Sequence, residues 1–320
     1  MSRRTLLFIR WGVFVAACAF LYMRLARHGD VAGFVAVFRM RDTGFMLGAL
    51  VLLLMLMFVN WGLESMKWRV LVRGIEPVSA RGAFTATIAG TSIGMITPNR
   101  VGEFVGRVLF LAPENRIPAS FATAVGSIAQ FVITLVFGTI GFVVMRSGTW
   151  EHDASPWEAI ALIGLCGAVA VCSVLLYFNP EILRALVARL PVVRKWEPQA
   201  AVFGTFGTRT LLRVLLFSAL RYVVFTTQFM IILVALADVW PRESLAVVPA
   251  AFLFSSLIPT VMLTELGVRG SVAVAMISPH LDYDKSVFLA STTLWLINIA
   301  LPAMAGAIIL LVARIRAARA

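Results

Sequence analysis

Charged residues are scarce in this 320-residue chain, at 14%, whereas a soluble domain carries about a quarter. Hydrophobic residues make up 60% and the mean hydropathy is +0.92. Residues 44–63, 119–145 and 159–180 contain no charged residue at all. A helix needs about 20 apolar residues to cross a hydrocarbon layer of about 30 Å. The shortage of charge therefore excludes a soluble globular protein and predicts an all-α, polytopic membrane protein.

Cysteine and histidine are also rare, with three of each. The cysteines fall inside apolar runs without metal-type spacing, and the histidines lie in or beside predicted loops. The sequence also offers no nucleophile–histidine pair and no nucleotide-binding loop. We therefore expect no metal, no cofactor and no catalytic constellation, that is, a protein that is not an enzyme. The residues concerned are Cys18, Cys166, Cys172, His28, His152 and His280.

Acidic residues are outnumbered, 16 against 28 basic ones, which gives a net charge of +12. The basic residues are spread along the chain rather than gathered into a nucleic-acid-binding module. In a membrane protein such an excess is typical of cytoplasmic loops and of contact with anionic lipid head groups. The charge therefore indicates a membrane lipid as partner and no nucleic acid.

Six segments are long and apolar enough to span. The first begins with MSRRTLLFIR, like a signal peptide, but its apolar body is long and ends in the bulky residues 21–23. We interpret it as a retained span. The predicted spans are residues 5–26, 44–66, 119–145, 158–179, 212–237 and 286–312.

Two other apolar regions, residues 80–112 and 244–280, are interrupted near the middle by proline, glycine and charge. Their arms, such as 82–96 and 101–112, would measure only about 18–24 Å as helices, too short to cross. We predict that each region is a re-entrant hairpin. With the N-terminus inside, most basic residues, including Lys67 and Arg107, fall on the cytoplasmic side, which predicts that both termini are cytoplasmic.

The same topology contains an internal repeat. Residues 44–145 and residues 212–312 each read as span, hairpin, span, and the two units enter the membrane from opposite sides. Inverted repeats of this kind build alternating access around a midplane site in many transporters. The sequence therefore predicts one transmembrane domain, residues 1–320, made of two inverted repeats.

The two hairpin tips, MITPNRVGEFVGR (95–107) and SSLIPTVMLTELGVRGS (255–271), share a proline and a glycine flanked by both charge signs. Proline ends the first arm, and a second helix is expected to begin near Gly102 or Gly267. The N-terminus of that helix would attract an anion. Backbone that is not helical is tolerated at membrane depth only where it packs against protein or lines a water-filled cavity, so we expect such surroundings at both tips.

Arginine presents a planar fork that fits phosphate oxygens, so Arg100, Arg107 and Arg269 suit a lipid phosphate. Glu103 and Glu265 would hold these arginines through ion pairs, or would carry a proton. Purely structural roles for the charged residues and glycines of the first tip also remain open.

Glu103 in a first helical turn complements the helix dipole, and Arg107 at the interface would only snorkel to it. The Gly102–Gly106 pair forms a GxxxG motif that serves close packing.

Four further polar residues lie within spans. Arg221 is about 24 Å from the outer end of its span, so a site role and snorkelling to the cytoplasmic interface are both open. Gln130, Gln228 and Asn298 fall near mid-span, where amides bridge helices or line a polar path.

The tips also resemble those of the lysylphosphatidylglycerol synthase transmembrane-domain, or flippase-like, family. Its first motif has the form P-x-R-x-G-E followed by R, and its second P-x(n)-G-x-G-x-R-E. This chain departs in the second motif, where Glu265 precedes the glycine and Gly270 follows the arginine. The matching residues are Pro98, Arg100, Gly102, Glu103 and Arg107, then Pro259, Glu265, Leu266, Gly267, Val268 and Arg269.

The resemblance implies a lipid translocase of the cytoplasmic (inner) membrane of a bacterium that moves an anionic or head-group-modified lipid between leaflets. The lipid would be an anionic phospholipid or a polyprenyl- or hopanoid-type lipid. Because the chain ends soon after its last span, we expect no soluble aminoacyl-transferase domain. The alternatives are a membrane-embedded lipid-modifying enzyme, with Glu103 or Glu265 as base, and an accessory scaffold of a lipid or isoprenoid pathway with a protein partner. The oligomeric state is not predicted.

Overall fold

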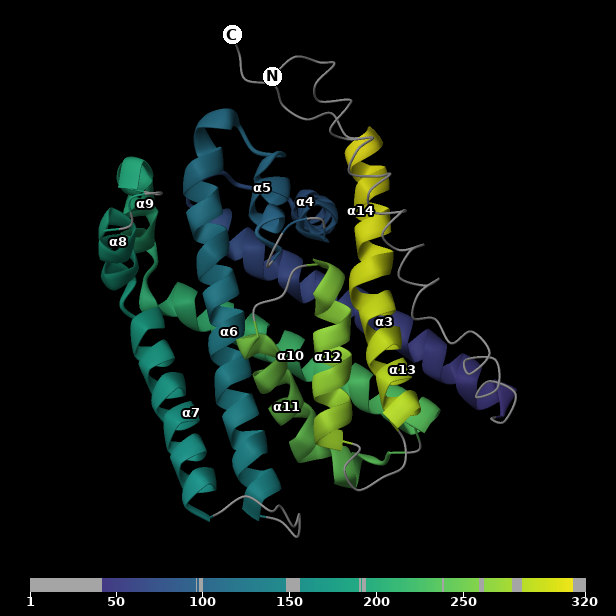
Figure 1. Ribbon diagram of the computed structural model, residues 1–320. Coiled ribbons are helices and arrows are strands. Elements are labelled where there is room, and N and C mark those ends of the chain that lie inside the picture. Colours follow the sequence, from purple (N-terminus) through teal and green to yellow (C-terminus); the bar gives the residue numbers. More distant parts are fainter. Residues whose placement is uncertain are drawn as a thin grey trace.

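The computed structural model describes residues 42–95, 97, 100–147, 156–189, 191, 194–237, 239–258, 262–277 and 284–312. All regular elements in these ranges are helical, so the predicted all-α class is confirmed (Figure 1). The predicted span 5–26 lies outside the described residues.

Within the described ranges, five helices are long and apolar enough to cross a membrane, and they coincide with the other five predicted spans. The last of them is interrupted by η5, a π-helical segment that carries Asn298. These helices are α3 (Thr43–Val72), α6 (Arg116–Ser147), α7 (Pro156–Tyr177), α10 (Thr208–Ala237), and the run α13 (Asp284–Trp295), η5 (Leu296–Ala300) and α14 (Leu301–Val312).

Shorter helices occupy the two predicted hairpin regions: α4 (Ala80–Met95) with α5 (Gly102–Val108), and α11 (Pro241–Leu257) with α12 (Met262–Ile277). Helix α5 begins at Gly102, as predicted. The prediction for α12 was wrong, because this helix begins before Gly267. Proline is tolerated at the first turn of a helix, where its missing N–H would be unpaired anyway, so a helix can begin within a few residues of Pro259 without a glycine.

Glycines hold α4 and α5 together. A Cβ on Gly106 would lie 2.6 Å from Gly90 Cα, and one on Gly94 would overlap the Glu103 side chain. Gly102 faces the Ile93 carbonyl in the same way. The interpretation of the GxxxG motif as a close-packing surface is therefore confirmed.

Each short-helix pair packs on a long helix from the other part of the chain. Helix α4 packs against α14, where Gly306 meets the Ile88 carbonyl. Helix α11 packs against α6, where Gly138 meets Leu253 and Gly141 meets Pro249. Helices α3 and α10 pack on each other, and α13 packs on α10 and α12. Figure 1 shows α4 and α5 above α11 and α12, between α6 and α14.

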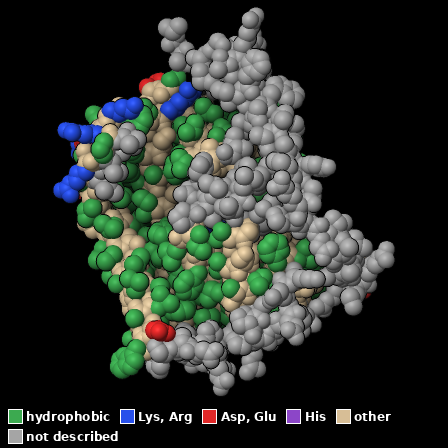
Figure 2. Space-filling model, viewed as in Figure 1, with side chains coloured by type: hydrophobic (Ala, Val, Ile, Leu, Met, Phe, Trp, Pro, Cys, Tyr) green, Lys and Arg blue, Asp and Glu red, His purple; other side chains and the backbone are tan. Residues whose placement is uncertain are grey.

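Short helices connect α5 to α6 and α7 to α10. Figure 2 shows hydrophobic side chains over the visible faces of α6 and α7, and Lys and Arg side chains gathered near α8 and α9 at the upper left. The connecting elements are η2 (Pro113–Asn115), α8 (Pro180–Arg189), η3 (Arg194–Trp196), α9 (Glu197–Ala200) and η4 (Ala201–Thr205).

Candidate functional site

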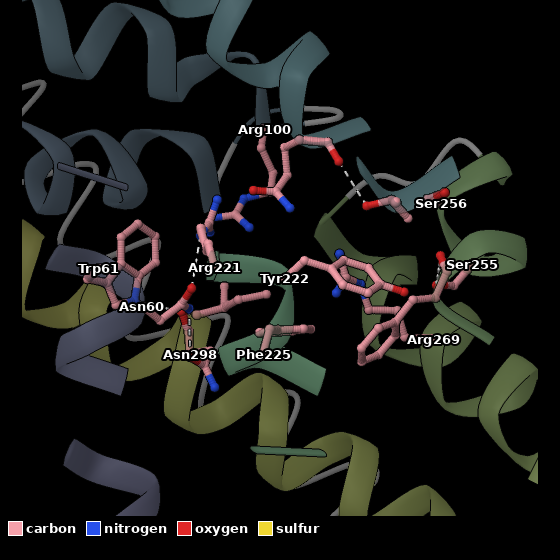
Figure 3. Close-up of a pocket in the computed structure, with 14 residues that line it drawn as sticks. Asn60, Trp61, Arg100, Arg221, Tyr222, Phe225, Ser255, Ser256, Arg269 and Asn298 are labelled. Atoms are coloured by element: carbon pink, nitrogen blue, oxygen red, sulfur yellow. Dashed lines mark hydrogen bonds between the residues drawn. The ribbon is translucent and has the colours of Figure 1, made fainter. Parts of the chain in front are cut away.

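A cavity of about 210 Å³ lies where the segment before α5 approaches α11 and α12. Its wall combines guanidinium, amide and hydroxyl groups with aromatic rings (Figure 3). Arg100 and Arg221 lie on one side of the view and Arg269 and Ser255 on the other. The lining residues are Asn60, Trp61, Arg100, Gln130, Thr134, Arg221, Tyr222, Phe225, Phe252, Ser255, Ser256, Arg269, Asn298 and Ile299.

Arg100 stands at the turn between α4 and α5 in a left-handed backbone conformation, with φ of 58°. This conformation is unfavourable for most residues other than glycine and is found where surrounding structure enforces it. The guanidinium pairs with the carboxylate of Glu103, one turn along the chain. The N–H of Gly102 donates to Thr97 Oγ1 at 2.7 Å. A side chain thus satisfies one N–H at the start of α5, and the anion site expected at this N-terminus stays a prediction.

A continuous chain of ion pairs runs from this turn into the protein. Arg107 places Nη2 3.0 Å from Glu103 Oε2 and Nη1 2.8 Å from Glu64 Oε1. Glu64 Oε2 in turn accepts from Lys67 Nζ and from Arg221 Nη1, both at 2.7 Å. We call these six residues, Glu64, Lys67, Arg100, Glu103, Arg107 and Arg221, the ion-pair network.

The centre of the network is inaccessible. The side chains of Glu64, Lys67 and Arg107 are only 5%, 2% and 5% exposed. The snorkelling interpretation of Arg107 was therefore wrong, because two carboxylates hold its guanidinium inside the protein. Arg107 does not line the cavity, and its role in substrate binding stays a prediction. Lys67, which the sequence assigned to the cytoplasmic side, lies within α3, which continues to Val72, and it is buried against Glu64.

Arg221 connects the network to the cavity. Its Nε donates to Asn60 Oδ1 at 3.0 Å, and its Nη1 bonds Glu64. Its guanidinium carbon lies 5.5 Å from the centre of the Trp61 ring, a cation–π distance. Snorkelling is thus the wrong interpretation of Arg221, because its charge points to partners inside the protein.

The three predicted mid-span amides separate into two kinds. Asn298 accepts from Asn60 Nδ2 at 3.0 Å, and Gln130 donates to the Ser218 carbonyl at 3.4 Å; both line the cavity. Gln228 is fully buried and donates to the Leu53 carbonyl at 3.1 Å. It bridges α10 and α3 away from the cavity, so only the helix-bridging role applies to it.

The second predicted tip contributes Ser255, Ser256 and Arg269 to the cavity. Gly267 belongs to α12 but is not among the lining residues, and the same holds for Gly102 and Glu103. The predicted site residues Pro98 and Pro259 and the Glu265 side chain lie outside the described residues.

Residues 9–307 match the model of one protein family, the lysylphosphatidylglycerol synthase TM region. This chain belongs to that family. No curated protein and no solved structure matches it. Family membership and the five apolar helices together indicate an integral membrane protein that associates with membrane lipids. The family acts in lipid modification or translocation.

The sequence analysis missed the residues of α3 that contact Arg107 and Arg221. Asn60, Trp61, Glu64 and Lys67 share one face of α3 and are each at most 4% exposed. A usable signal was present. Glu64 and Lys67 stand one turn apart directly after an uncharged run, and a charge pair that continues a span is expected to face protein rather than lipid.

Metal binding gains no support from these residues. Within the described ranges, no group of three or more His, Cys, Asp or Glu side chains is close enough to hold a metal ion. The chemistry that this wall can perform is recognition of a ligand by guanidinium, amide and hydroxyl groups.

Proposed function

We propose that this chain is a lipid translocase that moves an anionic or head-group-modified lipid between leaflets of the cytoplasmic membrane, without changing it covalently. The supporting observation is the cavity, where Arg100, Arg221 and Arg269 arrive from three different elements. Each guanidinium offers N–H donors suited to phosphate oxygens. The head group would occupy the cavity while the acyl chains stay in lipid.

The proposal includes re-entrant hairpins formed by α4–α5 and α11–α12, and inverted repeats at residues 44–145 and 212–312, with both termini cytoplasmic. Helix α4 has 16 residues, about 24 Å, which is short for a crossing. The reciprocal packing of α4 on α14 and of α11 on α6 is the pairing that such a repeat would produce. Rocking of one repeat against the other would expose the cavity to each side in turn.

Ion-pair exchange would link binding to this movement. Arg221 holds Glu64, and Arg100 holds Glu103. A phosphate in the cavity competes with those carboxylates for the same guanidinium donors. Its arrival would therefore weaken the contact of α10 with α3 and the contact between Arg100 and α5, while its departure would restore both.

Reconstitution tests the proposal. Purified protein is placed in liposomes that contain phosphatidylglycerol labelled with a fluorophore on an acyl chain, and outer-leaflet fluorescence is quenched by dithionite. We expect the fluorescence of lipid that starts in the inner leaflet to be lost faster than in protein-free liposomes. Arg221→Gln should slow it by about tenfold or more, since a charged hydrogen bond contributes about 1.5–3 kcal/mol. Arg213→Gln, exposed on the same helix, is the matched control and should leave the rate unchanged.

The same vesicles separate the alternatives. A correctly folded wild type that moves no lipid faster than empty liposomes contradicts the translocase proposal. A chemically altered lipid, detected by mass spectrometry after addition of a cell extract as donor, would instead support a lipid-modifying enzyme. Normal lipid flux in cells that carry Arg100→Ala with Arg269→Ala would support a scaffold.

A further inference from the structure

The last span contains a proline, Pro302, four residues after Asn298. In an α-helix the carbonyl of each residue accepts a hydrogen bond from the N–H of the residue four places further on. Proline has no N–H, so Pro302 cannot supply this bond to the carbonyl of Asn298. The π-helical segment Leu296–Ala300 ends two residues before this proline. The carbonyl of Asn298 is therefore available to a donor from another helix.

That donor comes from α3. Trp61 Nε1 donates to the Asn298 carbonyl oxygen at 3.2 Å, and Asn60 Nδ2 donates to Asn298 Oδ1 at 3.0 Å. The three residues are each at most 2% exposed. Two consecutive residues of α3 thus contact both the backbone and the side chain of one residue of η5. Because buried polar groups are costly to leave unpaired, these contacts hold Asn60 and Trp61 in place.

The same two residues of α3 hold Arg221. Asn60 Oδ1 accepts from Arg221 Nε at 3.0 Å, and the guanidinium carbon lies 5.5 Å from the centre of the Trp61 ring. Arg221 Nη1 donates to Glu64 Oε2 at 2.7 Å. A guanidinium group is planar, so holding Nε and Nη1 also fixes the direction of the remaining nitrogen, Nη2. Figure 3 shows the two successive hydrogen bonds, from Arg221 to Asn60 and from Asn60 to Asn298.

The orientation of the Asn60 amide decides whether it can hold Arg221. The amide oxygen must face the guanidinium group, because the NH₂ group is a donor and offers no acceptor. Asn298 Oδ1 accepts from that NH₂ group on the other side and so fixes the orientation. Without this acceptor the amide could turn about its terminal bond, for which two orientations are about equally allowed. The side chain of Asn298 therefore controls a contact that it does not itself make.

We infer that Asn298 is a positioning residue for the guanidinium group of Arg221. It acts through two residues of α3, Asn60 and Trp61. The inference rests on the proposed function, because it assigns Asn298 a part in presenting Arg221 to the lipid phosphate. It also gives Pro302 a role, since the carbonyl that lacks a partner at this proline holds the Trp61 ring. The last span, α3 and α10 thereby meet at one guanidinium group.

The test follows the Nε–H of Arg221 by NMR. Protein with isotope-labelled arginine is studied in neutral detergent, and the signal missing from Arg221→Gln is the one that reports on this group. Asn298→Leu should speed the exchange of this Nε–H with water by about fivefold, because Asn60 no longer holds it. Gln228→Leu removes another buried amide bond to α3 and is the matched control, with unchanged exchange. Unchanged exchange in Asn298→Leu overturns the inference.

A second variant, Pro302→Ala, alters the same contact and leaves the side chains of α3 and η5 intact. The alanine supplies an N–H to the carbonyl of Asn298, which can then release Trp61. The Nε–H of Arg221 should again exchange faster than in the wild type. This variant carries the test if Asn298→Leu does not fold, and exchange as slow as in the wild type overturns the role of Pro302.

Lipid movement separates positioning from a general loss of stability. Asn298→Leu should slow the movement of phosphatidylglycerol in liposomes by about fivefold, but by less than about twofold when Arg221 is already replaced by Gln. Equal slowing in both backgrounds overturns the inference. If the Nε–H responds to Asn298→Leu but the wild type moves no lipid, the positioning role stands and the translocase proposal fails.

Discussion

The two short-helix pairs meet at one cavity but are held in different ways. In the first pair, α4 and α5 pack through facing glycines, and the Arg107 side chain fixes α5 to α3 through Glu64. In the second pair, α11 packs against α6, and α12 packs against α13, where Gly270 meets the Phe288 ring. Both pairs pack on long helices, but the first is in addition closely packed on itself through glycines and anchored by ion pairs.

This difference assigns separate tasks to the two pairs. The first carries Arg100 at its turn, where Glu103 pairs with the guanidinium. The second brings Arg269 and the serine hydroxyls to the opposite wall on helices attached through side-chain contacts. Changes that loosen the packing or the ion pairs of the first pair should therefore mainly reduce stability, whereas loss of a cavity-lining side chain from either pair should mainly affect lipid handling.

The largest expected effect comes from Glu64→Gln. The change leaves Lys67, Arg107 and Arg221 without their shared carboxylate in a buried site. Removing one partner of a buried ion pair costs about 3–5 kcal/mol, so the free energy of unfolding in detergent should fall by that amount. Glu114→Gln, at an exposed position, is the control and should change it by less than about 0.5 kcal/mol. A loss below about 1 kcal/mol at residue 64 would show that the network does not anchor the first pair.

A matched pair of glycine variants compares the two packing modes directly. Gly106→Ala directs a methyl group into the backbone of Gly90, so α4 and α5 must separate, at a cost of about 1–3 kcal/mol. Gly270→Ala meets only the Phe288 ring, which can shift, and should cost less. Both variants gain similar helix propensity, so the difference in unfolding free energy isolates packing. A larger loss at Gly270 would reverse the comparison.

Arg100→Asn should separate stability from function at the first turn. Asparagine tolerates positive φ, so the unfolding free energy should stay within about 1 kcal/mol of the wild type. Translocation of phosphatidylglycerol should nevertheless fall by about tenfold, because one of the three guanidinium groups of the cavity is lost. Arg100→Val removes the charge and disfavours the positive φ, so it should lower both the unfolding free energy and the rate of translocation. Unchanged lipid movement in the asparagine variant would remove Arg100 from the site.

The smallest effect is expected at Gln228. Its replacement by leucine removes one hydrogen bond between α10 and α3, and such bonds in membrane proteins average about 0.6 kcal/mol. Lipid movement should not change, because Gln228 does not line the cavity. A change of lipid movement in Gln228→Leu would mean that α10 transmits its packing to the cavity.

The sequence correctly predicted the five spans that fall within the described residues and the two interrupted regions, because a lack of charge and the presence of proline are local properties. The pairing of Glu103 with Arg100 and Arg107 was also accessible, since residues three and four apart share a helix face. Gln130, Asn298, Arg221 and the two tip arginines that line the cavity were among the predicted residues.

The anchoring of those arginines was not accessible, because it depends on contacts that local spacing does not encode. Glu64 meets Arg107 across 43 residues of chain and Arg221 across 157. Ending the predicted span at residue 66 also assigned Lys67 to a loop, although α3 continues through it. A hydropathy profile reports how apolar a segment is, but not which neighbour its last turns contact.

The π-helical segment Leu296–Ala300 has a consequence for the whole last span. A π turn holds about one residue more than an α turn, and each residue advances a helix by about 100°. Helix α14 is therefore rotated in phase relative to α13. One continuous span can thus turn one side to α10 and α12 and, farther along, a different side to α4. Deleting a single residue there would put the two halves back in phase and turn Gly306 away from the Ile88 carbonyl.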